Sequence, residues 1–210
     1  RPYGYICKEV IIPVTNSSIA KQLPNIINDS FKIVIRDSGS NSDNSTGTGN
    51  TLVYYNGVTL NQGVKSNETI DGFAVQLTDK EKTTYGKAKI IYQWIGNNIS
   101  YDYNKADKVL KNDFSDSSGA IPAFNSEKGI CFDYSCLYVA MCRANGIKVR
   151  LITGEGFNGV SWVSHAWNQV YVPEEDRWIN VDTTFFKAGN YFDSKRFQID
   201  HRSDQIAGQW

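Results

Sequence analysis

Hydrophobic residues recur at helical spacing in two segments of the chain. The first predicted helix spans residues 80–97, with Thr78 or Asp79 as its N-terminal cap. Its apolar face consists of Tyr85, Ala88, Ile91, Tyr92 and Ile95. A second helix is predicted from about Cys131 to Ala144, because Asn145-Gly146 is a usual helix stop.

Hydrophobic and polar residues alternate in three later segments, which predicts three strands. They cover residues 147–153, 161–172 and 178–183, with a turn at Pro173–Asp176 between the last two. Because the predicted helices precede an antiparallel sheet, the expected fold class is α+β.

The first 75 residues show a mixed pattern. A short helix is predicted over residues 17–28 and a strand over residues 31–35, followed by a polar loop over residues 37–50. Asn56-Gly57 predicts the two-residue turn of a hairpin over residues 52–60.

Composition places the chain among globular proteins and narrows its partners. Hydrophobic residues make up 40% of its 210 residues, which is enough for a core. The 22 basic and 22 acidic side chains balance, without the basic excess of a nucleic-acid-binding protein. No apolar run approaches the roughly 18 residues of a membrane span. We therefore expect no nucleic-acid partner and no transmembrane segment.

The location of the protein is predicted from two further features. The chain opens with Arg1-Pro2-Tyr3 and no Met, so we expect a fragment or a mature form whose secretion signal or anchor lies outside it. Asn, Ser, Thr and Gly are abundant, as in many surface-exposed bacterial domains. Both features favour an extracellular or cell-surface location.

Several patterns that would indicate a cofactor or a metal are incomplete. Gly154–Gly159 matches G-x-G-x-x-G but precedes a predicted strand rather than a helix, so we interpret it as a flexible loop. A calcium-loop-like segment from Asp37 lacks the required Gly and Glu. Two histidines without H-E-x-x-H, and four cysteines without C-x-x-C, argue against a zinc site. We expect no cofactor and no metal, and we assign Cys136 and Cys142 to core packing.

Cys131 follows Lys128-Gly129-Ile130 at the predicted start of a helix. Backbone N–H groups and the helix dipole at that position favour a thiolate and can hold a developing oxyanion. Gly129 would let a substrate backbone approach closely. A buried cysteine with a packing role is the alternative, and Cys131 taken alone does not separate the two interpretations.

His165 and Asp182 lie in two of the predicted strands. If the turn between these strands has four residues, Val172 pairs with Arg177 and His165 lies opposite Thr184. His165 is then diagonal to Asp182, with Cα atoms about 7–8 Å apart and side chains within reach. An imidazole oriented by a carboxylate is the base that a thiol nucleophile needs.

Three segments resemble the catalytic segments of the transglutaminase-like superfamily. They are GICFDYS at 129–135, SHAWNQVYV at 164–172 and WINVDTTF at 178–185. The Cys-to-His spacing of 34 and the His-to-Asp spacing of 17 are typical of that family. The segments at 143–147 (RANGI) and 99–102 (ISYD) fit it as well. The resemblance covers roughly residues 76–190.

The resemblance implies a papain-like α+β catalytic core over residues 76–210, with an N-terminal extension or small accessory region over residues 1–75. It implies Cys131 as nucleophile, His165 as general base and then acid, and Asp182 as the group that orients His165. The implied chemistry is attack on a protein glutamine or peptide amide, giving a thioester that an amine or water resolves. The expected partner is a protein or cell-wall peptide substrate.

Several alternatives stay open at this point. The spacing does not separate a cross-linking transferase from a protease. A non-catalytic binding or scaffolding module on the same fold is one rival, and a general papain-like peptidase is another. Tyr101 and Trp94 are candidates for the family's oxyanion-stabilising side chain, although both could equally be core aromatics.

Overall fold

The structure is a computed structural model that describes residues 53–210, apart from the side chain of Ser203. The elements predicted at 17–28, 31–35 and 37–50 lie outside the described residues, as does the calcium-loop-like segment.

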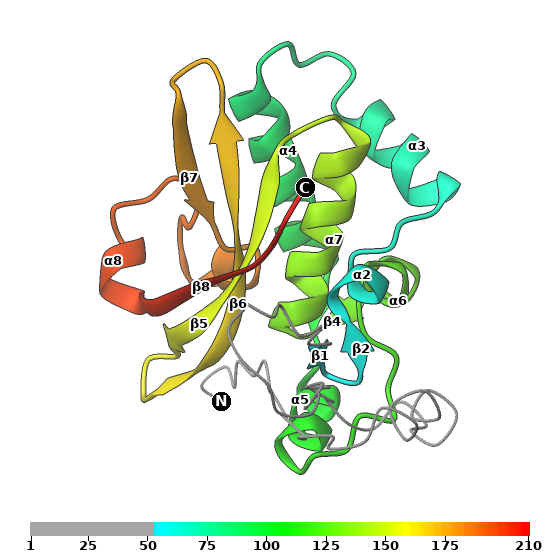
Figure 1. The fold of residues 1–210 in the computed structure, drawn as a ribbon, viewed down its shortest axis with the longest axis vertical. Helices are drawn as coiled ribbons and strands as arrows, with labels where there is room; N and C mark the ends of the chain where they lie inside the picture. The colour runs from blue at the N-terminus through cyan, green and yellow to red at the C-terminus, as the bar shows by residue number, and fades with distance from the viewer. Residues whose placement is uncertain (1–52) are drawn as a thin grey trace, which may run out of the picture.

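Four antiparallel strands form the main sheet, in the order β7-β6-β5-β8 (Figure 1). They are β5 (Val149–Phe157), β6 (Trp162–Val172), β7 (Arg177–Val181) and β8 (His201–Gln209). Val172 pairs with Arg177 across the turn at 173–176, which confirms the predicted register. The first three strands were predicted, whereas β8 was not.

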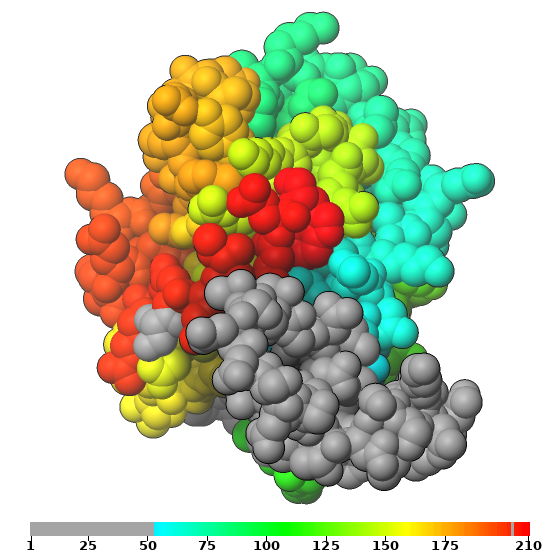
Figure 2. Space-filling model, in the orientation of Figure 1, coloured from blue at the N-terminus to red at the C-terminus, as the bar shows by residue number. Residues whose placement is uncertain are grey.

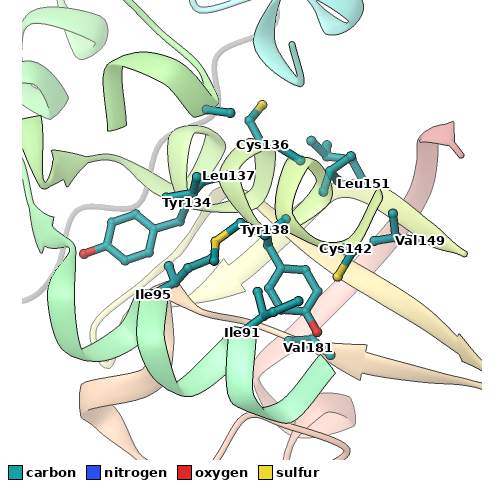
Figure 3. Close-up of a cluster of buried hydrophobic side chains, with 14 of the residues drawn as sticks. Ile91, Ile95, Tyr134, Cys136, Leu137, Tyr138, Cys142, Val149, Leu151 and Val181 are labelled. Carbon is teal, nitrogen blue, oxygen red and sulfur yellow. The ribbon is translucent and has the colours of Figure 1, made fainter. Parts of the chain in front are cut away.

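Two long helices, α4 (Thr84–Asn98) and α7 (Cys131–Ala144), pack beside the sheet (Figure 1). Every residue of α7 from Cys131 to Cys142 is buried. Figure 3 shows its side chains between Ile91 and Ile95 of α4 and Val149 and Leu151 of β5. The helix therefore forms the centre of the core, and the fold class is α+β, as predicted.

A second, smaller apolar cluster involves neighbouring positions of the same strands. Successive residues of a strand point to opposite faces of the sheet, so Leu151 belongs to the main core and Ile152 to the smaller cluster. Trp167, Phe185, Tyr191 and Phe197 complete the smaller cluster.

The remaining elements are short and connect or cover these layers. Before α4 lie β1 (Tyr54–Tyr55), β2 (Val58–Thr59), α2 (Leu60–Gly63) and α3 (Glu68–Leu77). Between α4 and α7 lie β3 (Ser100–Tyr101), α5 (Tyr103–Leu110), α6 (Ala120–Ser126) and β4 (Lys128–Gly129). Between β7 and β8 lie the 3-10 helix η1 (Thr184–Ala188) and α8 (Phe197–Asp200).

The predicted hairpin at Asn56-Gly57 is confirmed. Asn56 has φ 48° and Gly57 has φ 86°, the left-handed backbone that a type I′ turn needs at both positions. The second strand ends early, however, because Thr59 caps α2 and Leu60 is its first residue.

Some predicted boundaries were wrong, each for a local reason. The predicted helix over 80–97 begins only at Thr84, because the Thr83 side chain, rather than Thr78 or Asp79, accepts the capping hydrogen bond from the Gly86 amide. The strand predicted from residue 147 begins at Val149, because the Ile147 amide closes the preceding helix on the Cys142 carbonyl.

The interpretation of Gly154–Gly159 as a flexible loop was wrong over most of its length. Gly154 to Phe157 belong to β5 and pair with β6 from His165 to Trp162. Only the last two residues lie in the connection to β6, where Gly159 has φ 92°. Paired backbone on both sides holds these glycines in the sheet despite their low strand propensity.

Candidate functional site

His165 and Asp182 are in direct contact. Nε2 of His165 lies 2.7 Å from Oδ2 of Asp182, and both side chains are buried. The contact does not arise from a continuous ladder, because β7 ends at Val181 and Thr184, the predicted neighbour of His165, begins η1. Instead the Asp182 amide donates to the Tyr191 carbonyl as the chain leaves β7. The predicted pair is therefore adjacent, although its predicted cross-strand geometry was only partly right.

The Asp182 carboxylate accepts four hydrogen bonds. Oδ1 accepts from the amides of Thr184 and Phe185, at 2.8 and 3.2 Å. Oδ2 accepts from Nε2 of His165 at 2.7 Å and from Nε2 of His201 at 3.0 Å. Burial opposes ionisation, but the interactions with His165 and His201 outweigh it and hold the pKa of Asp182 well below its usual range. The carboxylate is therefore ionised at neutral pH.

The His165 imidazole is enclosed by aromatic rings, with centroids of Phe185 at 4.8 Å and Trp167 at 5.9 Å. Burial lowers the pKa of His165, and the nearby Asp182 carboxylate only partly offsets this effect. A neutral imidazole whose Nε2–H donates to a carboxylate keeps Nδ1 as its proton-accepting nitrogen. This is the form that a general base requires.

Gly156 of β5 leaves room for that imidazole. A Cβ atom at this position would lie 2.8 Å from Cδ2 and 3.0 Å from Cγ of His165. The G-x-G-x-x-G segment thus contributes to the candidate site through the absence of a side chain. This role was not predicted, because Gly156 was assigned to a loop; glycine within a strand often marks such a close approach.

Cys131 is the first residue of α7 and is buried. Asp133, two residues later, fixes that end of the helix. Its carboxylate accepts hydrogen bonds from the Ile130 amide at 2.9 Å, the Gly119 amide at 2.7 Å and Lys105 Nζ at 2.7 Å. The helix start predicted from the sequence is confirmed, and Asp133 is a supporting residue that was not predicted.

Gly129 has a packing role that was not predicted. A Cβ atom there would lie 2.6 Å from Cβ of Asp133. The missing side chain therefore allows β4 to pass close to the first turn of α7. The close approach of a substrate backbone at Gly129 stays a prediction.

A cavity of about 230 Å³ lies between the segments that carry Cys131 and Asp182. Tyr134, one helical turn after Cys131, lines it, and so do Thr183 and Thr184, which follow Asp182. Residues three apart share a face of a helix, so Tyr134 and Cys131 project from the same side of α7. The cavity therefore adjoins the predicted site.

The two oxyanion candidates differ in position. Tyr101 pairs with Gly129, lines the cavity and packs against the smaller apolar cluster. Trp94 packs against Phe73 and Phe124, with ring centroids 4.7 and 5.8 Å away. Tyr101 thus lies beside the candidate site, while Trp94 belongs to an aromatic group of the core.

His201 is a site residue that sequence reasoning missed. It is the first residue of β8, is buried, and lies on the same carboxylate oxygen as His165. No motif spacing pointed to it, because His201 lies outside the three segments that carry Cys131, His165 and Asp182.

His165, Asp182 and His201 form a group that could coordinate a divalent cation, with ligand atoms within 4.8 Å of one another. In the observed arrangement both Nε2 atoms lie within hydrogen-bond distance of one carboxylate oxygen. A cation would have to displace both hydrogen bonds and both Nε2 protons. The donor set is therefore better suited to holding protons than to holding a metal.

The other two described cysteines belong to the core. Cys136 and Cys142 are both fully buried within the main apolar cluster. Burial raises the pKa of Cys142 well above the usual thiol range, so this side chain stays protonated. The predicted packing role is confirmed for both.

Comparison with known proteins gives a relative that matches over part of its length. The UPF0252 protein MJ1282 of Methanocaldococcus jannaschii is 35% identical over 126 residues, which are 58% of this chain and 33% of that protein. The chain thus spans about a third of the length of this curated relative.

In the described part of the chain, no helix is long and apolar enough to cross a membrane.

Two solved structures give weaker matches. A cysteine protease candidate from Cytophaga hutchinsonii matches with a TM-score of 0.47 and 25% identity, covering 60% of this chain and 41% of that one. The periplasmic domain of TgpA from Pseudomonas aeruginosa matches with a TM-score of 0.44 and 23% identity, covering 59% and 44%.

A family model provides the assignment. The model of the transglutaminase-like superfamily matches residues 71–183, just over half of the chain. The match includes the segments of Cys131, His165 and Asp182, and it ends before His201. The chain therefore belongs to the transglutaminase-like superfamily, a family of cysteine-dependent enzymes.

Proposed function

We propose that this protein catalyses acyl transfer from amide bonds through a thioester on Cys131. The observation that carries the proposal is the buried 2.7 Å contact between His165 and the ionised Asp182. It orients a neutral imidazole whose Nδ1 is the proton-accepting nitrogen. The start of α7 supplies a thiol at a helix N-terminus, where thiolates are stabilised.

The proposed reaction proceeds in two halves. Nδ1 of His165 takes the Cys131 proton, and the sulfur attacks the amide carbonyl carbon to form a tetrahedral intermediate. The imidazolium then donates its proton to the leaving nitrogen, the C–N bond breaks, and an amine departs. An incoming amine or water attacks the thioester, gives its proton to His165, and expels the thiolate. The first outcome is cross-linking and the second is hydrolysis.

Backbone N–H groups at the start of α7 and the Tyr101 hydroxyl are the proposed donors to the developing oxyanion. Both lie beside the candidate site: α7 begins at Cys131, and Tyr101 pairs with Gly129 and lines the adjoining cavity. The proposed substrate is a glutamine side chain or a peptide amide of a protein or cell-wall peptide. The proposed place of action is outside the cell or at its surface, as expected from the composition.

Alkylation of the thiols tests the nucleophile. Cys131, Cys136 and Cys142 are all fully buried, so burial in the resting structure does not single out one of them. We expect iodoacetamide to label Cys131 faster than the other two below about pH 8, measured residue by residue by mass spectrometry. His165→Ala should slow labelling of Cys131 and leave Cys136 unchanged. Equal labelling of the three thiols would instead favour a non-catalytic binding module.

Incorporation of a dansylated amine into a glutamine-containing protein, measured beside ammonia release, separates cross-linking from hydrolysis. His165→Ala should reduce either activity by roughly 10²–10⁴-fold, and Cys131→Ala should abolish it. Cys142→Ala is the matched control, because it removes a thiol from the other end of α7. Activity that persists in Cys131→Ala would rule out the proposed mechanism.

A further inference from the structure

We propose that His201 is a positioning residue of this site, which holds the Asp182 carboxylate through the oxygen that also orients His165. This inference rests on the proposed function, because it assigns His201 a task within the same reaction. It also extends the site beyond the family match, since residue 201 lies outside residues 71–183.

The contact itself is direct. Nε2 of His201 lies 3.0 Å from Oδ2 of Asp182, and the His201 side chain is almost completely buried. The residue is supplied by the sheet, as the first position of β8, where it pairs with Gly156 of β5. Figure 2 shows β8, in red, as part of the surface. His201 is the buried residue of this strand, whereas its other described side chains are exposed or half-buried.

The direction of the hydrogen bond follows from the charge of Asp182. An ionised carboxylate only accepts, so Nε2 of His201 must carry the proton. The same reasoning applies to Nε2 of His165. Two Nε2–H groups therefore converge on Oδ2, while two backbone amides occupy Oδ1. Each carboxylate oxygen accepts from two donors, which leaves the Asp182 side chain little freedom to rotate.

Gly156 allows the two imidazoles to approach each other. It pairs with His201 on one side, and its missing side chain leaves room for the His165 ring on the other. The two ring centroids are 5.5 Å apart. The strand β5 thus separates β6 from β8 in the sheet without separating the two histidine side chains.

Aromatic packing fixes the orientation of the His201 ring. Phe197 stacks on it at 4.0 Å, and Trp167 meets it edge-on at 4.9 Å. The titratable groups that face it are Asp182, His165 and Tyr191. The Tyr191 hydroxyl donates a hydrogen bond to the Asp200 carboxylate. A purely structural role would depend on the ring, whereas a positioning role depends on the Nε2–H donor.

Two substitutions separate these roles. His201→Gln keeps an N–H donor near the position of Nε2 and loses the ring, whereas His201→Phe keeps the ring and loses the donor. The readout is the rate of Cys131 alkylation by iodoacetamide as a function of pH, with Cys136 as the internal reference. We expect His201→Gln to stay within a few-fold of the unsubstituted protein and His201→Phe to fall by roughly tenfold or more.

Nuclear magnetic resonance provides an independent measurement on the unsubstituted protein. The chain contains only two histidines, so ¹⁵N-labelled imidazoles give two sets of signals. We expect Nε2 of both rings to carry a proton that is hydrogen-bonded to Asp182. We also expect His201→Phe to change the Nε2–H signal of His165. These results do not require a substrate and remain informative if one variant folds poorly.

The outcomes distinguish the inference from the proposed function. Fast alkylation of Cys131 that His201→Phe does not change would overturn the positioning role and leave the proposed function intact. Unselective alkylation in the unsubstituted protein would overturn the proposed function, while the tautomers would still test the pairing of His201 with Asp182. An Nδ1–H tautomer at His201 would also contradict the inference. So would a Cys131 alkylation rate that is higher in His201→Phe than in His201→Gln.

Discussion

At the scale of single residues, the candidate site depends on a glycine as much as on charged groups. Gly156→Ala would place a methyl group 2.8 Å from the His165 ring, closer than van der Waals contact allows. We expect the imidazole to shift and the alkylation of Cys131 to slow by roughly tenfold or more, since small misplacements of a catalytic group are costly. Gly72→Ala is the control, because a Cβ there meets nothing within 4 Å. Equal rates in the two variants would contradict this role.

Individual residues also show where the sequence was informative. Cys131, His165 and Asp182 could be proposed because buried polar groups need partners and the register followed from a four-residue turn. His201 could not, because its partner lies 19 positions earlier and its strand shows no hydrophobic alternation. Gly156 was misread because glycine occurs more often in loops than in strands, and only tertiary contact reveals its role.

At the scale of elements, the start of α7 is held by a buried ion pair. Lys105 Nζ lies 2.7 Å from the Asp133 carboxylate and also donates to the Ser117 carbonyl. Asp133→Ala would leave the buried ammonium without its counter-charge and remove the acceptor of two backbone amides. We expect a loss of about 3–5 kcal/mol in the free energy of unfolding, measured by urea denaturation.

The exposed pair of Lys108 and Asp116 provides the matched control for that prediction. Its atoms are 2.8 Å apart, but both side chains are about two-fifths exposed. Asp116→Ala should therefore cost no more than about 1 kcal/mol. Similar losses from the two substitutions would show that the buried pair does not anchor the helix.

Long elements were predicted better than their ends. α7 was right at both ends, because a strong apolar run is followed by Asn145-Gly146. α3 was missed, since a short helix with only two buried residues has a weak periodic signal. The start of α4 was placed too early because three residues nearby could cap a helix, and only the folded chain shows that Thr83 does so.

At the scale of the whole molecule, the buried histidine and carboxylate link stability to pH. The pKa of His165 is lowered from 6.5 on folding and that of Asp182 from 3.8, so the unfolded chain binds more protons than the folded chain. The stabilisation from His165 is complete above about pH 6.5 and is lost as the pH falls below it. Asp182 adds a further loss below about pH 4.

We therefore expect the free energy of unfolding to fall as the pH is lowered from about 6.5 to about 5, before most carboxylates titrate. Urea denaturation at several pH values measures it. His165→Phe should flatten the curve in that range, since it removes the group whose pKa is lowered there. A free energy that rises on acidification would contradict the assignment of a neutral His165.

The position of β8 has a consequence for the order in which the protein is made. A ribosome synthesises Cys131, His165 and Asp182 before it reaches His201, and β8 then pairs with β5 as the last strand of the sheet. Until β8 docks, one edge of β5 is unpaired and His165 is the one imidazole in contact with the Asp182 carboxylate. A nascent chain thus contains its thiol, base and acid before His201 can hold the Asp182 carboxylate. We therefore expect the site to become fully ordered only after β8 has been synthesised.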